Sequence, residues 1–207
     1  MKISILSLFR DSENHLPETL ESLEALENRF EDYRFDYFFY ENDSTDNTVK
    51  ILSEWLRSRK GHLTTEDLGK AKFSSTTHTE RMTDLVYYRN TLLESATPLS
   101  SDYCVLLDSD VAFDPSILSS YIDIFDDPEF SDVVMVTPNV LQNIKCKMFD
   151  PTQDSYYDSW ALRDRFDNRG MTWTCNPFFN LQDRIRWVNK QPVYVNSAFG
   201  GCPIIKS

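Results

Sequence analysis

Short apolar runs alternate with helical patterns over the first 140 residues of the chain. Apolar runs of strand length cover residues 3–9, 35–40, 62–68, 103–107 and 133–137. Apolar side chains recur at helical spacing over residues 17–30, 49–56, 79–96 and 115–125. This alternation predicts an α/β fold, in which a mainly parallel central sheet with right-handed crossovers is flanked by helices. The first run, at the very start of the chain, is expected to be a central strand.

The pattern changes from about Asp150 onward, where no long helical period continues and aromatic side chains become frequent. These aromatic residues are Tyr156, Tyr157, Trp160, Trp173, Phe178, Phe179 and Trp187. Each of them alone is expected to belong to a small second core, and stacking platforms for sugar rings are the functional alternative. We expect one domain over residues 1–207, with a nucleotide-binding part over 1–140 and an irregular, aromatic-rich acceptor part over 141–207. The strand-like run just before Ser207 is compatible with a domain cut from a longer chain.

Composition and charge exclude several classes of protein. The chain has 207 residues, of which 41% are hydrophobic and 14% aromatic, so it is globular rather than disordered. A net charge of -12 argues against nucleic acid or an anionic membrane as the main partner. No apolar run reaches the roughly 18 residues that a membrane helix needs. The four cysteines, with no CxxC spacing, are expected to be reduced thiols, so we expect a cytosolic protein without membrane insertion.

The run YCVLLDSDVAFDP, residues 103–115, places two carboxylates at the end of an expected strand. Alternate residues of a strand share a face, so Asp108 and Asp110 are expected to point into one space. Two carboxylates held close together favour a hard divalent cation such as Mn²⁺ or Mg²⁺. An acidic turn without function is the alternative. A haloacid-dehalogenase-like phosphatase would instead use Asp108 as a nucleophile, although that pattern usually has Thr or Val where this chain has Ala112.

The octet ENDSTDNT, residues 41–48, follows the second expected strand in the same way. Ligands of parallel sheets bind beyond the carboxyl ends of the strands. The octet and the Asp108–Asp110 segment are therefore expected to face one cleft.

Arg89 falls within the apolar stripe expected for the helix over residues 79–96. The other members of that stripe are Met82, Leu85, Val86, Leu92, Leu93 and Ala96. A buried guanidinium needs an anionic partner, so either a structural salt bridge or contact with a phosphate or nucleotide base is expected.

Several of these motifs resemble those of one class of enzymes. ENDSTDNT resembles the DDGSTDGT element of glycosyltransferases of the GT-A fold, Arg89-Asn90 resembles their RN helix, and VLLDSDVAF resembles their metal-binding DxD strand. SYYDSWALRD and VNSAFGG are similar to stretches of the fungal capsule-associated mannosyltransferase-like family. The chain is also similar to the N-terminal domain of multidomain glycosyltransferases of chlorella-infecting viruses. The resemblance implies the GT-A fold and, for a viral protein, the host cytosol as its location.

The resemblance also implies roles for individual residues. Glu41 would accept a hydrogen bond from a uracil ring, Arg89 would contact the base or diphosphate, and Asp108 the ribose or metal. Asp110 would bind the metal, Mn²⁺ or Mg²⁺. The residues predicted to bind the nucleotide are Ser7, Glu41, Asp43, Arg81, Arg89 and Asp108, with Arg89 or Arg81 as a clamp on the charge of the diphosphate.

The implied activity is metal-dependent transfer of a hexose or deoxyhexose, such as glucose or rhamnose, from a UDP-sugar to a glycan hydroxyl. If the anomeric centre inverts, a carboxylate must deprotonate the acceptor, and Asp158 followed by Asp164 are the candidates. If it is retained, no base is required there. A non-catalytic module that binds nucleotide sugars is a second alternative, because a fold does not guarantee turnover. Further catalytic domains in the same chain are expected.

Overall fold

The computed structural model describes the chain except for residues 74–78, 98, 146–152 and 173. The described residues form two compact units. The first comprises Met1–Tyr121 together with Ile204–Ser207, and the second comprises Ile122–Pro203. The last strand of the chain therefore belongs to the first unit.

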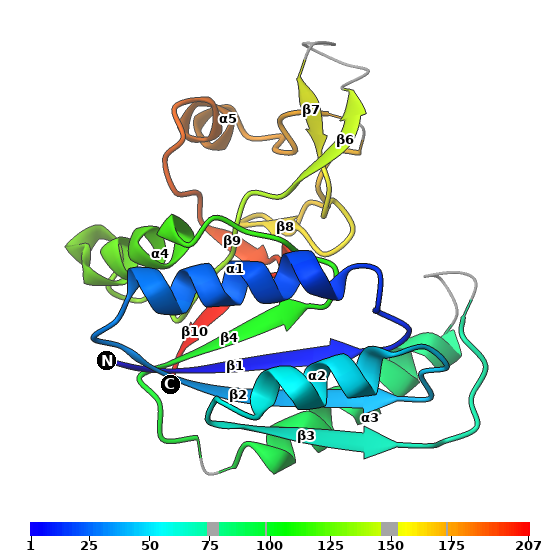
Figure 1. Ribbon diagram of the computed structural model, residues 1–207. Helices are drawn as coiled ribbons and strands as arrows, with labels where there is room; N and C mark the ends of the chain where they lie inside the picture. The colour runs from blue at the N-terminus through cyan, green and yellow to red at the C-terminus, as the bar shows by residue number, and fades with distance from the viewer. Residues whose placement is uncertain (74–78, 98, 146–152, 173) are drawn as a thin grey trace. The chain divides into compact units, whose positions relative to one another are not determined.

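The first unit contains a mainly parallel sheet, as the strand and helix pattern predicted. Its strands are β1 (Lys2–Phe9), β2 (Arg34–Asn42), β3 (Gly61–Glu66), β4 (Tyr103–Asp108) and β10 (Ile204–Lys206). Their order is β3-β2-β1-β4-β10 (Figure 1). β1 pairs in parallel with both β2 and β4, and β10 is antiparallel to β4. The α/β class and the central place of the first strand are confirmed.

Helices cover both faces of this sheet. They are α1 (Leu16–Arg29), α2 (Thr48–Leu56) and α3 (Thr79–Ser95), whereas α4 (Ser116–Asp126) spans the boundary between the two units. Figure 1 shows α2 in front of β2 and β3, with α3 behind them. Because successive strand residues point to opposite faces, Phe39 stacks on Trp55 of α2 whereas Tyr40 stacks on Tyr88 of α3. Because β2 is buried on both faces, its residues 37–40 form a continuous apolar run.

The buried face of α3 differs from the stripe expected from the sequence. The residues of α3 that are buried are Tyr88 and Leu92. Met82, Val86 and Leu93 are exposed, and Arg89 lies on the exposed side of the helix. The prediction of a buried Arg89 is therefore wrong. The aromatic Tyr88, which stacks on Tyr40 with ring centroids 5.4 Å apart, sets the rotation of the helix.

The second unit is built from short strands and one helix. These elements are β5 (Met135–Val136), β6 (Leu141–Lys145), β7 (Asp154–Tyr156), β8 (Arg163–Asp164), β9 (Val195–Ser197) and α5 (Leu181–Val188), with a 3-10 turn at Pro128–Phe130. β6 pairs with β7 and β8 with β9, both antiparallel. Tyr156, Leu162 and Phe178 form a small core with Trp187 against it, whereas Tyr157 and Trp160 are exposed. The expected second core is thus present, and Trp173 lies outside the described residues.

The structure bears on two expectations from the sequence, the reduced cysteines and the lack of a membrane helix. Cys104, Cys175 and Cys202 are free thiols, and Cys146 lies outside the described residues. Among the helices that the structure describes, none has the length and apolarity to cross a membrane.

Candidate functional site

Three parallel strands of the first unit end side by side. Leu8 of β1 is level with Tyr40 of β2 and with Asp108 of β4, and Phe9 is level with Glu41. Since neighbouring strands lie about 4.8 Å apart, the ends of β2 and β4 are roughly 10 Å apart across β1. The octet and the Asp108–Asp110 segment thus leave the same edge of the sheet. That both segments face one cleft stays a prediction, because the pocket described below is lined by the octet and not by residues 108–110.

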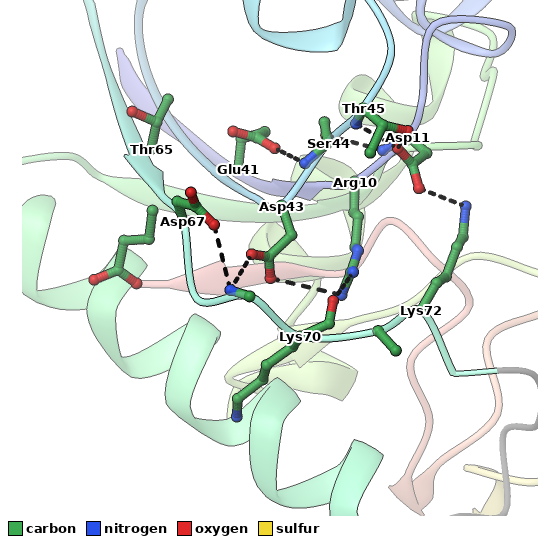
Figure 2. Close-up of a pocket in the computed structure, with 13 residues that line it drawn as sticks. Arg10, Asp11, Glu41, Asp43, Ser44, Thr45, Thr65, Asp67, Lys70 and Lys72 are labelled. Atoms are coloured by element: carbon green, nitrogen blue, oxygen red, sulfur yellow. Dashed lines mark hydrogen bonds and ion pairs between the residues drawn. The ribbon is translucent and has the colours of Figure 1, made fainter.

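A pocket of about 680 Å³ opens at this edge, beyond β1, β2 and β3 (Figure 2). It is lined by Arg10, Asp11, Glu41, Asp43, Ser44, Thr45, Thr65, Glu66, Asp67, Gly69, Lys70, Ala71 and Lys72. Its volume lies in the range of sites for small ligands. Cationic and acidic groups alternate around it, which suits a ligand carrying both phosphates and hydrogen-bonding rings.

Glu41 and Asp43 shape the octet at the end of β2. Glu41 is 3% exposed, and its Oε1 accepts a hydrogen bond of 2.7 Å from the Ser44 amide. Asp43 has a positive φ of 53°, a conformation that Asp tolerates better than most residues. The turn therefore brings both carboxylates to the wall of the pocket.

The Asp43 carboxylate ties this turn to the segment after β3. Its Oδ1 accepts hydrogen bonds from the amides of Leu68 at 2.7 Å and Gly69 at 2.8 Å. Its Oδ2 accepts one of 2.8 Å from Asn42 Nδ2. Burial opposes ionisation, but these bonds and the nearby Arg10 charge outweigh it and lower the pKa of Asp43. Asp43 is therefore a charged anchor.

Three cationic side chains line the pocket, and none of them was predicted from the sequence to belong to the site. Arg10, directly after β1, has one terminal guanidinium nitrogen 3.8 Å from Asp43 Oδ2, and the other donates to the Lys70 carbonyl. Lys72 pairs with Asp11 at 3.5 Å, and Lys70 pairs with Asp84 of α3. A basic residue immediately after a central strand was the available signal for Arg10. Lys70 and Lys72 carried no signal, because they reach the pocket through the path of the chain after β3.

The loop after β4 carries the two candidate metal ligands. β4 ends at Asp108, and a turn follows in which the Val111 amide donates to the Asp108 carbonyl at 3.3 Å. Thr19 of α1 fixes the turn by donating a 3.0 Å hydrogen bond to the Ser109 carbonyl. Asp108 is half-buried and Asp110 is exposed. Because Asp110 lies in a turn beyond the end of β4, the alternation of a strand does not set the direction of its side chain. That Asp108 and Asp110 point into one space stays a prediction.

The donor set of this loop fits a divalent cation that is also held by a ligand. Within the described residues, no group of three or more acidic, His or Cys side chains could hold a metal ion by itself. Mg²⁺ commonly binds through one or two carboxylates, with substrate phosphates and waters completing its shell. Asp108 and Asp110 are the residues of this loop that could supply the carboxylates of such a site.

Three other predicted residues lie away from the lining of this pocket. Ser7 is buried within β1, and its hydroxyl donates a 2.6 Å hydrogen bond to the Leu107 carbonyl of β4. Arg81 is half-buried in the first turn of α3, and Arg89 is exposed two turns later. Of the residues predicted to bind the nucleotide, the pocket brings together Glu41 and Asp43.

Asp158 lies in the second unit, where its carboxylate connects the SYYDSWALRD stretch with the VNSAFGG stretch. Its Oδ2 accepts hydrogen bonds from the amides of Phe199 at 3.1 Å and Gly200 at 2.8 Å. Gly200 has a φ of 61°, and a Cβ there would lie 2.8 Å from the Pro138 carbonyl. Asp158 is half-buried, and its Oδ1 accepts a longer hydrogen bond of 3.4 Å from the Ala161 amide.

Asp164 is enclosed by its own turn. It is 2% exposed and accepts hydrogen bonds from the amides of Phe166 and Asn168, at 2.9 and 2.8 Å, and from Asn168 Nδ2. Burial raises its pKa, but the hydrogen bonds outweigh burial and lower the pKa overall. This geometry is that of a carboxylate that holds a turn.

The sequence matches one family over nearly its whole length. A family model described as cryptococcal mannosyltransferase 1 matches residues 2–207. No curated protein matches the chain.

Solved structures similar to this chain include three from different organisms. S. aureus TarS in complex with UDP is 17% identical, with 86% of this chain and 45% of that chain covered and a TM-score of 0.48. The mannosyltransferase PcManGT from Pyrobaculum calidifontis, in complex with GDP-Man and Mn²⁺, is 16% identical, with coverages of 68% and 35% and a TM-score of 0.47. M. tuberculosis glucosyl-3-phosphoglycerate synthase is 15% identical, with coverages of 66% and 43% and a TM-score of 0.41. The chain spans less than half the length of each.

Proposed function

This chain belongs to the cryptococcal mannosyltransferase 1 family, and on that premise we propose that it is a GT-A glycosyltransferase that uses a nucleotide sugar. The observation that carries the proposal is the charged pocket at the carboxyl ends of β1 and β2, next to the end of β4. The donor is a UDP-sugar with a hexose or deoxyhexose, and the acceptor is a glycan hydroxyl. Glu41 lines the pocket, and in this proposal its carboxylate accepts a hydrogen bond from the uracil ring.

Asp110, with Asp108 beside it, would hold Mn²⁺ or Mg²⁺. Such an ion, when bound, stabilises the negative charge that builds on the leaving diphosphate. In this proposal, protein side chains bind the diphosphate in addition to the metal ion. Arg10, close to the strand ends, provides a fixed positive charge with hydrogen-bond donors suited to phosphate oxygens.

Asp158 is our proposed base if the reaction inverts the anomeric centre. The residue is half-buried, its Oδ2 is fixed by two backbone amides, and its Oδ1 accepts only one longer hydrogen bond, of 3.4 Å, from the Ala161 amide. Asp164 is less suited, because its carboxylate is buried and already accepts bonds from its own turn. A base must reach the proton it removes, and exposure favours Asp158.

The alternatives have less support. The family match over residues 2–207 favours a transferase over a phosphatase with Asp108 as nucleophile. A non-catalytic module would bind the nucleotide sugar without turning it over. A cytosolic location, a viral origin and further domains remain proposals.

Isothermal titration of UDP and GDP, with and without Mn²⁺, tests the donor site. We expect wild-type protein to bind UDP more tightly with Mn²⁺, and Asp110→Ala to lose the effect of the metal while keeping its fold. Asp123→Ala, a change of an exposed acidic residue of α4, is the matched control and should behave as wild type. Absence of binding to either nucleotide would contradict the proposal. Tight binding without release of UDP from any UDP-hexose, with and without glycan acceptors, would support the non-catalytic module.

A further inference from the structure

The segment after β3, residues 67–72, forms one wall of the pocket and is held there by residues from other strands (Figure 2). We call it the post-β3 segment. It contains no helix or strand, so no regular pattern of backbone hydrogen bonds within the segment fixes its path. Whatever holds it also sets the shape of the nucleotide site.

Asp43 is the centre of that attachment. Its Oδ1 accepts hydrogen bonds from two consecutive amides of the post-β3 segment, those of Leu68 and Gly69. Its Oδ2 faces Asn42 Nδ2 and the Arg10 guanidinium. The side chain is 7% exposed. Both oxygens are thus directed at protein donors, and little of the carboxylate is open to a ligand.

Arg10 shares the same attachment and keeps unused hydrogen-bonding capacity. One end of its guanidinium lies beside Asp43, and the other donates to the carbonyl of Lys70. Its Nε is buried and has no hydrogen-bond partner among the described residues. A buried donor without a hydrogen-bond partner costs free energy. A bound ligand, or a small rearrangement of Arg10 on binding, would remove that cost.

We propose that Asp43 is a positioning residue of the nucleotide site: it holds Arg10 and the post-β3 segment, and Arg10 contacts the diphosphate of the nucleotide. This inference rests on the proposed function. It gives Asp43 a role different from direct contact with the nucleotide, because the negative charge of Asp43 repels phosphate and is used to orient the cation that attracts it.

The first test measures the attachment without any nucleotide. In Asp43→Asn the positive φ is still tolerated, but an amide replaces the oxygen that faces Asn42 and Arg10. We expect hydrogen exchange of the peptide containing residues 67–72 to become about 10-fold faster, as it also should in Arg10→Met. Asp43→Asn keeps Oδ1 opposite the Leu68 and Gly69 amides but removes the negative charge that strengthens those hydrogen bonds and orients Arg10. Arg10→Met removes the hydrogen bond to the Lys70 carbonyl. Asp46→Asn is the matched control: Asp46 anchors the same octet, through Thr48 and Glu13, but does not line the pocket. Unchanged exchange in both pocket variants would overturn the inference.

The second test is a double-mutant cycle on UDP binding in the presence of Mn²⁺. We expect Asp43→Asn to weaken binding about 10-fold in the wild-type background and less than about 2-fold in the Arg10→Met background, because it acts through Arg10. Equal weakening in both backgrounds would overturn the inference and assign Asp43 a direct contact. If wild-type protein bound no nucleotide, the proposed function would fail, and the exchange experiment alone would decide whether Asp43 positions the segment.

Discussion

Two carboxylates of this chain, one buried and one half-buried, hold turns. Asp164 lies in the second unit, is 2% exposed and accepts bonds from two backbone amides of its turn. Asp46 does the same for the start of α2, where it accepts a 2.9 Å hydrogen bond from the Thr48 amide. Both have lowered pKa values, because their hydrogen bonds outweigh the opposing effect of burial. Each side chain therefore stabilises the fold in its ionised form.

Asp164→Asn is expected to lower the free energy of unfolding by about 1–3 kcal/mol at pH 7, the range for hydrogen bonds to charged groups. The folded pKa of Asp164 lies below its unfolded value of 3.8. Its stabilisation is therefore complete above that value and is lost as pH falls through the folded pKa. Urea unfolding of both proteins at pH 7 and at acidic pH should show the difference shrinking below about pH 4. Asp167→Asn, an exposed position three residues later, is the control and should change stability by less than about 0.5 kcal/mol. A difference that persists unchanged at low pH would contradict this account.

At the scale of elements, α3 shows how one aromatic contact chooses the buried face. A stripe containing both Leu92 and Leu93 was expected, but Leu92 is 3% exposed and Leu93 is 41% exposed. The stacking of Tyr88 on Tyr40 favours the face that contains Leu92. Exposed apolar residues on the opposite face are common on protein surfaces and do not mark the core.

This pair of leucines provides an internal comparison. We expect Leu92→Ala to lower the free energy of unfolding by about 2–5 kcal/mol, the cost of emptying a packed core position. Leu93→Ala should change it by less than about 1 kcal/mol, because little apolar surface is lost from the interior. Urea unfolding followed by circular dichroism measures both. Equal losses of unfolding free energy in the two variants would contradict this account and support the buried face predicted from the sequence, which contained both leucines.

At the scale of the whole molecule, the end of the chain completes the first unit. Ile204 in β10 is fully buried and pairs with Val105 of β4. The polypeptide thus leaves the first unit at about Tyr121 and returns at Ile204. Deleting the last four residues removes this strand from the sheet.

Ile204→Ala should therefore destabilise the first unit by about 2–5 kcal/mol, although it lies more than 80 residues from the rest of that unit in the sequence. Ile205→Ala, at the adjacent and half-buried position, should cost clearly less. Hydrogen exchange of β4 is the suitable measurement, because it reports on this sheet alone. Exchange in β4 that is unaffected by Ile204→Ala would show that β10 is not part of its stability.

The sequence by itself determined the order of strands and helices, the central first strand and the two acidic segments at strand ends. These follow from local periodicity and from the rule that parallel strands end at one edge. It also indicated Glu41 and Asp43, which line the pocket.

Only the tertiary structure decided which face of α3 is buried, where Asp110 lies and which cations reach the pocket. Arg10, Asp43 and Lys70 lie far apart in the sequence and share no motif. They meet because the post-β3 segment crosses the ends of β1 and β2. Such meetings depend on hydrogen bonds between segments far apart in the chain, and periodicity carries no information about them. The enclosure of Asp164 has the same cause, because its burial depends on packing that its neighbours in the sequence do not specify.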